Sequence, residues 1–107
     1  MWKKVYKSTE IPVGQSRCYK AGGAPIGIFR TGDGLYAVDN RCPHYDAELH
    51  MGEVVDGVVF CPWHRWAFQL KDGFCRLNRR FDLEVYPIKE ENGHIWVDAE
   101  AGAVLSR

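Results

Sequence analysis

Two short segments, each with one cysteine followed by one histidine, constrain this chain more than any other feature. The first is Cys42-Pro43-His44, and the second, after 16 intervening residues, is Cys61-Pro62-Trp63-His64. Together they use half of the cysteines and half of the histidines in 107 residues. Two thiolates can hold one iron and two imidazoles a second, with inorganic sulfides between them, so this pairing predicts a binuclear iron–sulfur centre.

The same four side chains could instead bind zinc, which accepts thiolate and imidazole ligands in a tetrahedron. Zinc motifs usually keep two cysteines in one segment and two histidines on one helix. Here each segment mixes the two residue types, and no helical pattern carries a histidine pair. The pattern therefore favours iron–sulfur chemistry, and a zinc-stabilised interaction module remains the less favoured alternative.

The ligand pattern and the sequence around it resemble the Rieske family of 2Fe–2S proteins. The similarity extends from the second Cys/His segment through the turn at Lys71-Asp72-Gly73 and into residues 83–88 and 94–97, so that it covers nearly the whole chain. The resemblance implies one 2Fe–2S cluster, with Cys42 and Cys61 on one iron and His44 and His64 on the other. It also implies an all-β Rieske fold, in which an antiparallel β-sandwich or barrel-like base carries an inserted cluster-binding β subdomain.

Short apolar runs that alternate with Gly- and Asp-bearing turns independently indicate an antiparallel β domain. The strongest hairpin signal is Asp56-Gly57 between β-branched residues. The expected strands are residues 2–6, 17–20, 26–30, 35–39, 53–55, 58–61, 66–70, 74–77, 83–89 and 94–98. We expect a single domain over residues 1–107, with the base formed by 1–40 and 81–107 and the cluster-binding subdomain by 41–80. Residues 99–107 are expected to form a surface tail.

Composition excludes several classes of function. Fourteen basic and fourteen acidic residues cancel, whereas a nucleic-acid-binding domain would carry a basic surplus. No apolar run approaches the ~18 residues of a membrane span, and no apolar stretch follows the lysines of Met1-Trp-Lys-Lys to form a signal peptide. We therefore expect a cytoplasmic protein in which Cys18 and Cys75 are buried thiols and not a disulfide.

Two positions depart from the commonest family pattern. Asp46 and Arg65 stand where many relatives have glycine. Because Arg tolerates positive φ poorly, the second loop is expected to have a different backbone here. Arg65, Arg79 and Arg80 are expected to make the cluster tip basic. Tyr45 and Trp63 are candidates for an exposed docking face at that tip, whereas Trp66 is expected to pack in the core.

The resemblance implies an electron carrier that makes and breaks no bonds in a substrate. It points to the ferredoxin of a system in which an NAD(P)H-dependent flavoprotein reductase supplies electrons and a terminal oxygenase acts on aromatic compounds. We expect a monomer with transient contacts. The alternative is the Rieske small subunit of an assimilatory NADH-dependent nitrite reductase. A chain that was itself an oxygenase would need a second, mononuclear iron site. Outside the two Cys/His segments, only His50 and His94 remain as histidine ligands for such a site.

Overall fold

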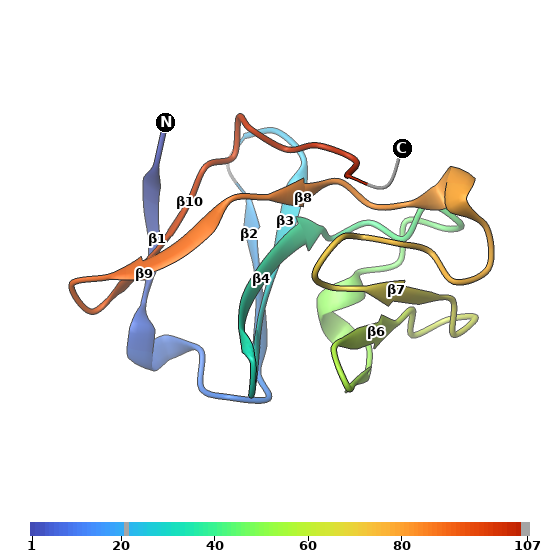
Figure 1. Ribbon diagram of the computed structural model, residues 1–107, viewed down its shortest axis with the longest axis horizontal. Coiled ribbons are helices and arrows are strands. Elements are labelled where there is room, and N and C mark those ends of the chain that lie inside the picture. Colours follow the sequence, from blue (N-terminus) through green and yellow to red (C-terminus); the bar gives the residue numbers. More distant parts are fainter. Residues whose placement is uncertain (21, 106–107) are drawn as a thin grey trace.

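The structure, a computed structural model, describes residues 1–20 and 22–105. Its strands form three antiparallel sheets, arranged along the long axis of a molecule that measures 38 × 26 × 21 Å (Figure 1). The first sheet has the order β1-β10-β9, and the second has the order β2-β3-β4-β8. The third, with the order β5-β6-β7, lies across the second sheet from the first. The all-β prediction is confirmed.

The bounds of the strands follow the apolar runs of the sequence. In the first sheet they are β1 (Lys3–Lys7), β9 (Ile88–Glu91) and β10 (His94–Val97). In the second they are β2 (Ser16–Lys20), β3 (Pro25–Thr31), β4 (Gly34–Asp39) and β8 (Val85–Tyr86). In the third they are β5 (Val54–Val55), β6 (Val58–Phe60) and β7 (Ala67–Gln69).

Two of the predicted hairpin turns are two-residue turns in which both residues have positive φ. The angles are 50° and 77° at Asp56-Gly57 and 55° and 77° at Asn92-Gly93. These angles match the twist of the flanking strands, and Asn, Asp and Gly tolerate them best. The turn at Asp56-Gly57 sets the register of β5 on β6, with Val55 opposite Val58, and so fixes where β6 delivers the second Cys/His segment.

Two apolar cores hold the sheets together. One joins the first and second sheets, and its buried members are Ile11, Ile26, Ile28, Ala37, Tyr86, Ile95 and Val97. The other lies beneath the Cys/His segments, and its buried members are Phe29, Val38, Cys42, Ala47, Leu49, Val59, Cys61, Phe68, Leu70, Cys75 and Leu83. Burial of one large apolar side chain contributes about 1.5–3 kcal/mol. Because the second core contains both Cys42 and Cys61, the packing that stabilises it also brings the two segments together.

Two expectations about strands were wrong. The run 83–89 is divided at Pro87, which has no N–H to donate, into β8 of one sheet and β9 of another. Residues 74–77 make only a single bridge, from Cys75 to Phe68. Residues 99–105 lie on the surface as expected, since they are exposed or half-buried, and Ala103 and Val85 hold them there by exchanging two backbone hydrogen bonds of 3.0 and 2.9 Å. The end of the predicted tail, residues 106–107, lies outside the described residues.

The helical elements are short 3-10 turns, as expected from the lack of an amphipathic pattern. They are η1 (Ser8–Glu10), η2 (Leu49–Met51) and η3 (Arg79–Phe81). Within the described part of the chain, no helix has the length and apolar character needed to cross a membrane.

Candidate metal centre

The two Cys/His segments fold into loops with the same backbone hydrogen bonds. In the first loop the N–H of Cys42 donates to the carbonyl of Ala47 (2.9 Å), and the N–H of Asp46 donates to that of Cys42 (2.7 Å). In the second loop the corresponding bonds run from Cys61 to Trp66 (2.8 Å) and from Arg65 to Cys61 (2.9 Å). In each loop the residue five positions after the cysteine is therefore hydrogen-bonded back to it, so the two cysteines occupy equivalent positions.

Both loops turn through a residue with positive φ, 55° at Asp46 and 56° at Arg65. The expectation that Arg65 changes the backbone of the second loop was therefore wrong. A left-handed conformation costs a non-glycine residue roughly 1–2 kcal/mol. Two contacts of the arginine side chain offset this cost. Its guanidinium lies 4.7 Å from the centroid of the Phe60 ring and 3.1 Å from the Glu53 carboxylate.

The two loops bring the four predicted ligands to one place. The ring centroids of His44 and His64 are 5.0 Å apart. The Cys42 and Cys61 side chains are both buried and in contact. His44 is half-buried and His64 is exposed. Two buried sulfurs thus lie beneath two imidazoles, of which one reaches the surface.

Burial is the main reason that the pKa of the Cys42 thiol rises to about 11, and the neighbouring Cys61 thiol contributes to the same rise. The backbone N–H groups of His44 and Tyr45 act in the opposite direction, because they donate toward the Cys42 sulfur and stabilise its thiolate. A buried thiolate with N–H donors and no cation beside it is unfavourable, and a metal ion bound to the sulfur removes that penalty.

Residues 1–87 match the family model of the Rieske [2Fe-2S] domain. The chain belongs to the Rieske family. Its relatives include the anthranilate 1,2-dioxygenase ferredoxin subunit of Burkholderia cepacia, which is 37% identical over 73% of each chain. Other curated relatives are much longer, and the chain spans only 18% and 25% of two of them.

Solved structures share the Rieske fold closely. A chain in the complex of reduced oxygenase and oxidized ferredoxin of carbazole 1,9a-dioxygenase is similar with a TM-score of 0.82 and 29% identity, over 92% of this chain and 94% of that one. A Mycobacterium tuberculosis protein assigned as the small subunit of an NADH-dependent nitrite reductase is similar with a TM-score of 0.83 and 28% identity, over 91% of this chain and 93% of that one. The coverage and the similarity extend beyond the site, so the expected family and its [2Fe–2S] cofactor are confirmed and the zinc alternative is not supported.

The residues of this chain fit a Rieske cluster. Nδ1 of His44 is buried and has no hydrogen-bond partner, although an unsatisfied buried polar atom costs about 1–3 kcal/mol. A bond from His44 to iron, with the resulting reorientation of the ring, would account for the missing partner. The donor set of two thiols and two imidazoles is also the one that a Rieske centre requires.

Aromatic rings surround the two histidines of the Rieske site. The ring of His44 lies 4.2 Å from that of Trp66 and 4.4 Å from that of Tyr45, measured between centroids. Trp66 is half-buried and packs on the second core, so it forms a wall of the site as well as part of the core periphery. Trp63 and Tyr45 are 64% and 57% exposed. The candidate docking aromatics are therefore accessible beside His64.

A cover segment, residues 75–82, packs against this site through η3. The Phe81 ring lies 5.2 Å from that of Trp66, and the buried Asp82 carboxylate accepts the N–H of Cys75 at 2.6 Å. The segment carries Arg79 and Arg80, as expected. The tip is less basic than predicted, because the third arginine, Arg65, is paired with Glu53.

The remaining cysteines and histidines are not among the four predicted ligands. Cys18 and Cys75 are both free thiols. Cys75 is buried as predicted, whereas Cys18 is only half-buried. His94 lies next to the carbonyl of Asn92 on the surface. His50 is half-buried and bonded to the buried Asn40. The sequence contained one signal for the buried position of Asn40. Gly27 is an isolated glycine inside a strand, and such a glycine often marks a place where another group comes close to the backbone.

Cys18, Glu48 and His50 each place one potential ligand atom within 4.8 Å of the other two. The Asn40 amide accounts for this cluster. Its Nδ2 lies 2.9 Å from Nδ1 of His50, and the same side chain bonds to the Cys18 thiol. We therefore assign the cluster to a hydrogen-bonded network.

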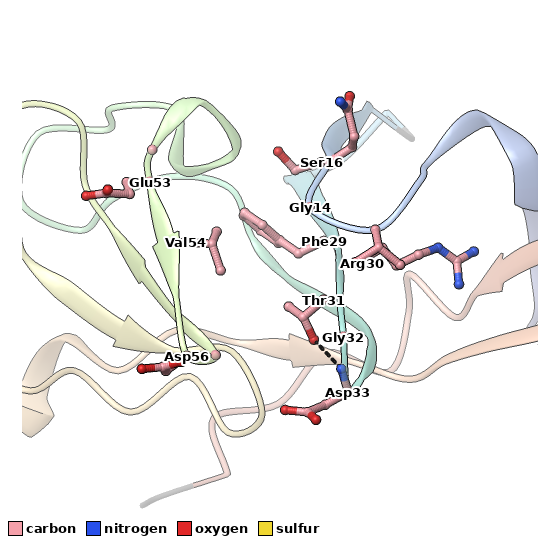
Figure 2. A pocket seen from close by; sticks show the side chains of 14 residues that line it. Gly14, Ser16, Phe29, Arg30, Thr31, Gly32, Asp33, Glu53, Val54 and Asp56 are labelled. Carbon is pink, nitrogen blue, oxygen red and sulfur yellow. Dashed lines mark hydrogen bonds between the residues drawn. The ribbon is translucent and has the colours of Figure 1, made fainter.

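A groove of about 510 Å³ separates the second sheet from β5 and is distinct from the Rieske site. Figure 2 shows Val54 and Phe29 facing each other across it, while the Arg30 side chain points away. Arg30 instead pairs with Glu90 at 2.7 Å. No Cys or His lines the groove, so it offers none of the iron ligands found at the tip.

Proposed function

We propose that this chain is a one-electron carrier whose [2Fe–2S] cluster is held by Cys42 and Cys61 on one iron and by His44 and His64 on the other. The observation that carries the proposal is the meeting of two equivalent loops, with both sulfurs buried and the two imidazole rings 5.0 Å apart. The bound cluster supplies reversible one-electron oxidation and reduction. We also propose that residues 41–80 form the inserted subdomain, since both loops and the sheet β5-β6-β7 fall within them.

The protein residues contribute burial, rigidity and an exit for the electron. Cys42 and Cys61 lie in the apolar core, which keeps water from the sulfurs. The backbone bonds of each loop hold its ligands in place, which limits rearrangement when the charge changes. His64 is exposed, so its ring offers the shortest path from the site to a partner.

The proposed partners are an NAD(P)H-dependent flavoprotein reductase and a terminal oxygenase acting on aromatic compounds. The identity with the anthranilate 1,2-dioxygenase ferredoxin subunit supports such a system, as does the similarity to a chain of the carbazole 1,9a-dioxygenase complex. We propose transient binding by a monomer. We also propose a cytoplasmic location, supported by the free thiols of Cys18 and Cys75.

A second candidate function is the small subunit of a nitrite reductase. The similarity to the Mycobacterium tuberculosis protein supports it. So does the exposure of Tyr45 and Trp63, since a permanent interface would bury such rings. Gel filtration of the chain from its native source separates the two functions. A carrier elutes alone, whereas a permanent subunit co-elutes with its large partner.

The test of the main proposal is spectroscopic. The purified chain is expected to be red-brown, to contain two irons and two acid-labile sulfides per chain, and to give a rhombic electron paramagnetic resonance signal after one-electron reduction. Stopped-flow mixing with a reduced flavoprotein reductase should bleach the oxidised spectrum. A colourless protein that binds zinc would contradict the proposal.

A further inference from the structure

Asn40 lies directly after β4 and two residues before the first cysteine ligand. Its side chain is 1% exposed, and Asn40 and Asp82 are the buried polar or charged residues of the described chain. Burial of an amide is costly unless its hydrogen bonds are made. The contacts of this side chain therefore show what keeps it in the core.

Asn40 makes hydrogen bonds through all of its polar groups. Its backbone N–H donates to Pro25 (2.9 Å), and its carbonyl accepts from Leu49 (2.8 Å). The side-chain Oδ1 accepts the N–H of His50 at 2.8 Å, and Nδ2 lies 2.9 Å from Nδ1 of the same histidine. The amide also bonds to the thiol of Cys18 and stabilises its thiolate. A single residue thus connects β2, β3 and η2.

Gly27 provides the space that this arrangement needs. It lies within β3, opposite Cys18 on one side and Val38 on the other. A Cβ at this position would come within 2.7 Å of the Asn40 Oδ1 and 2.9 Å of the Phe29 ring. Glycine inside a strand is destabilising relative to alanine. Here it gives the Asn40 amide its position against the sheet.

The two ligand loops differ in what closes them. The second loop, 61–66, is closed by the strand pair of β6 and β7, in which Phe60 lies opposite Ala67. The first loop, 42–47, leaves β4 and enters η2, so no regular strand pair closes it. Two features take the place of such a pair. One is an isolated bridge between Arg41 and Glu48, and the other is the pair of hydrogen bonds that Asn40 accepts from the N–H groups of Leu49 and His50.

We propose that Asn40 is a positioning residue for electron transfer: it fixes the first loop to the base sheet and so sets the orientation of His44 at the cluster. The proposal rests on the proposed ligand role of Cys42 and His44. In this proposal the buried side chain of Asn40 closes the first loop, as the pairing of β6 with β7 closes the second loop. The role requires both the acceptor Oδ1, which holds η2, and the donor Nδ2, which holds the His50 ring.

The first measurement is hydrogen exchange of the full chain as isolated. In Asn40→Ala, the amides of Leu49, His50 and Asp46 should exchange at least tenfold faster, while that of Arg65 in the second loop keeps its rate. Asn40→Asp retains an acceptor and should restore most of the protection at His50. Gln15→Ala is the matched control, because it removes an exposed side-chain amide that accepts a hydrogen bond from Arg17 in the base.

The second measurement is made on the cluster. Asn40→Ala should change the anisotropy of the reduced cluster's paramagnetic resonance signal and release iron to a chelator at least tenfold faster, with Asn40→Asp intermediate and Gln15→Ala unchanged. Equal exchange rates and an unchanged signal in Asn40→Ala would overturn the proposal. If Asn40→Ala does not fold, an Asn40→Asp protein with an unaltered signal and unaltered iron release overturns it equally. Absence of a Rieske spectrum in the unmutated chain would contradict the proposed function instead, and the exchange result would still decide the role of Asn40 in the loop.

Discussion

The indole of Trp66 lies flat against the imidazole of His44, with ring centroids 4.2 Å apart and planes inclined by 11°. On its other side the indole meets the edge of Phe81 from the cover segment. The proposed ligand His44 thus stacks on an apolar wall formed by Trp66 and Phe81. By resemblance to high-potential Rieske proteins, Trp66 and Phe68 occupy positions where those proteins place a Ser and a Tyr hydroxyl near the cluster.

We predict a reduction potential near the low end of the Rieske range, about −150 mV. Each hydroxyl that donates to a cluster sulfur stabilises the reduced, more negative state and raises the potential, and neither hydroxyl is present here. Phe68→Tyr should move the potential upward, and Trp66→Ser should do the same if it folds. Direct voltammetry at neutral pH measures this, and a midpoint clearly above zero in the unmutated chain would contradict the prediction.

Replacement of a ligand cysteine should abolish the cluster. Cys42→Ser or Cys61→Ser is expected to remove the visible spectrum and to lower the thermal unfolding midpoint, because both cysteines join loops within one core. Cys18→Ser and Cys75→Ala are the controls, since both residues are free thiols. Iron content and absorbance give the result. Loss of the cluster in Cys75→Ala with normal folding would refute the ligand assignment.

Trp63 should contribute to docking and not to cluster binding. Its side chain is 64% exposed beside Tyr45, whose ring lies 5.2 Å from that of His64. Exposed tryptophans at the centre of an interface often contribute 2 kcal/mol or more. Trp63→Ala should lower the second-order rate of electron transfer to the terminal oxygenase by about tenfold, which is about 1.4 kcal/mol. The potential should not change.

The control for docking is Trp2→Ala, which removes a 39% exposed tryptophan next to the base strand β1. Its transfer rate should equal that of the unmutated chain. Stopped-flow absorbance measures both variants, and a similar loss in both would show that Trp63 has no special place in docking.

The left-handed residue of the first loop provides a test of loop geometry. Asp46 has a φ of 55°, which glycine adopts freely and a β-branched residue does not. Asp46→Gly should leave the unfolding midpoint unchanged or raise it slightly. Asp46→Val should destabilise by about 1–3 kcal/mol. Thermal melting followed by circular dichroism compares them, and equal midpoints for Gly and Val would count against the loop conformation described here.

The Arg30–Glu90 pair should make the free energy of unfolding depend on pH in the acid range. The guanidinium of Arg30, aided by Ser8, lowers the pKa of the Glu90 carboxyl from 4.5 to about 2. Because the folded state has the lower pKa, the stabilisation is complete above about pH 4.5 and is lost as the pH falls toward 2. Glu90 is 38% exposed, so solvent screening limits the effect to about 1 kcal/mol or less.

Glu90→Gln is expected to lower the unfolding midpoint by about 4 °C or less near pH 7. The difference from the unmutated chain should be constant down to about pH 4.5 and shrink below it. Glu91→Gln, which removes a long 3.7 Å contact with Lys89, is the control and should have little effect. A difference that grows on acidification would contradict the assigned direction of the pKa shift.

The sequence was sufficient to predict the family and most strands and to propose the ligand set, because these depend on local signals. The spacing of Cys42, His44, Cys61 and His64 is characteristic by itself, and Asp56-Gly57 and Asn92-Gly93 specify their turns through their tolerance of positive φ. The strand over 83–89 was predicted as one piece because its apolar pattern is continuous. Its division at Pro87 depends on which sheet each half joins.

Tertiary structure alone decided what surrounds the site. Arg65 keeps the left-handed turn because Phe60 and Glu53 lie within reach of its side chain. Trp66 faces His44 because Phe81 closes over it from a segment 15 residues away. Asn40 is buried because Gly27 leaves space for its amide and His50 supplies its partners. Local propensity cannot foresee such contacts, since each depends on residues brought together only when the sheets pack.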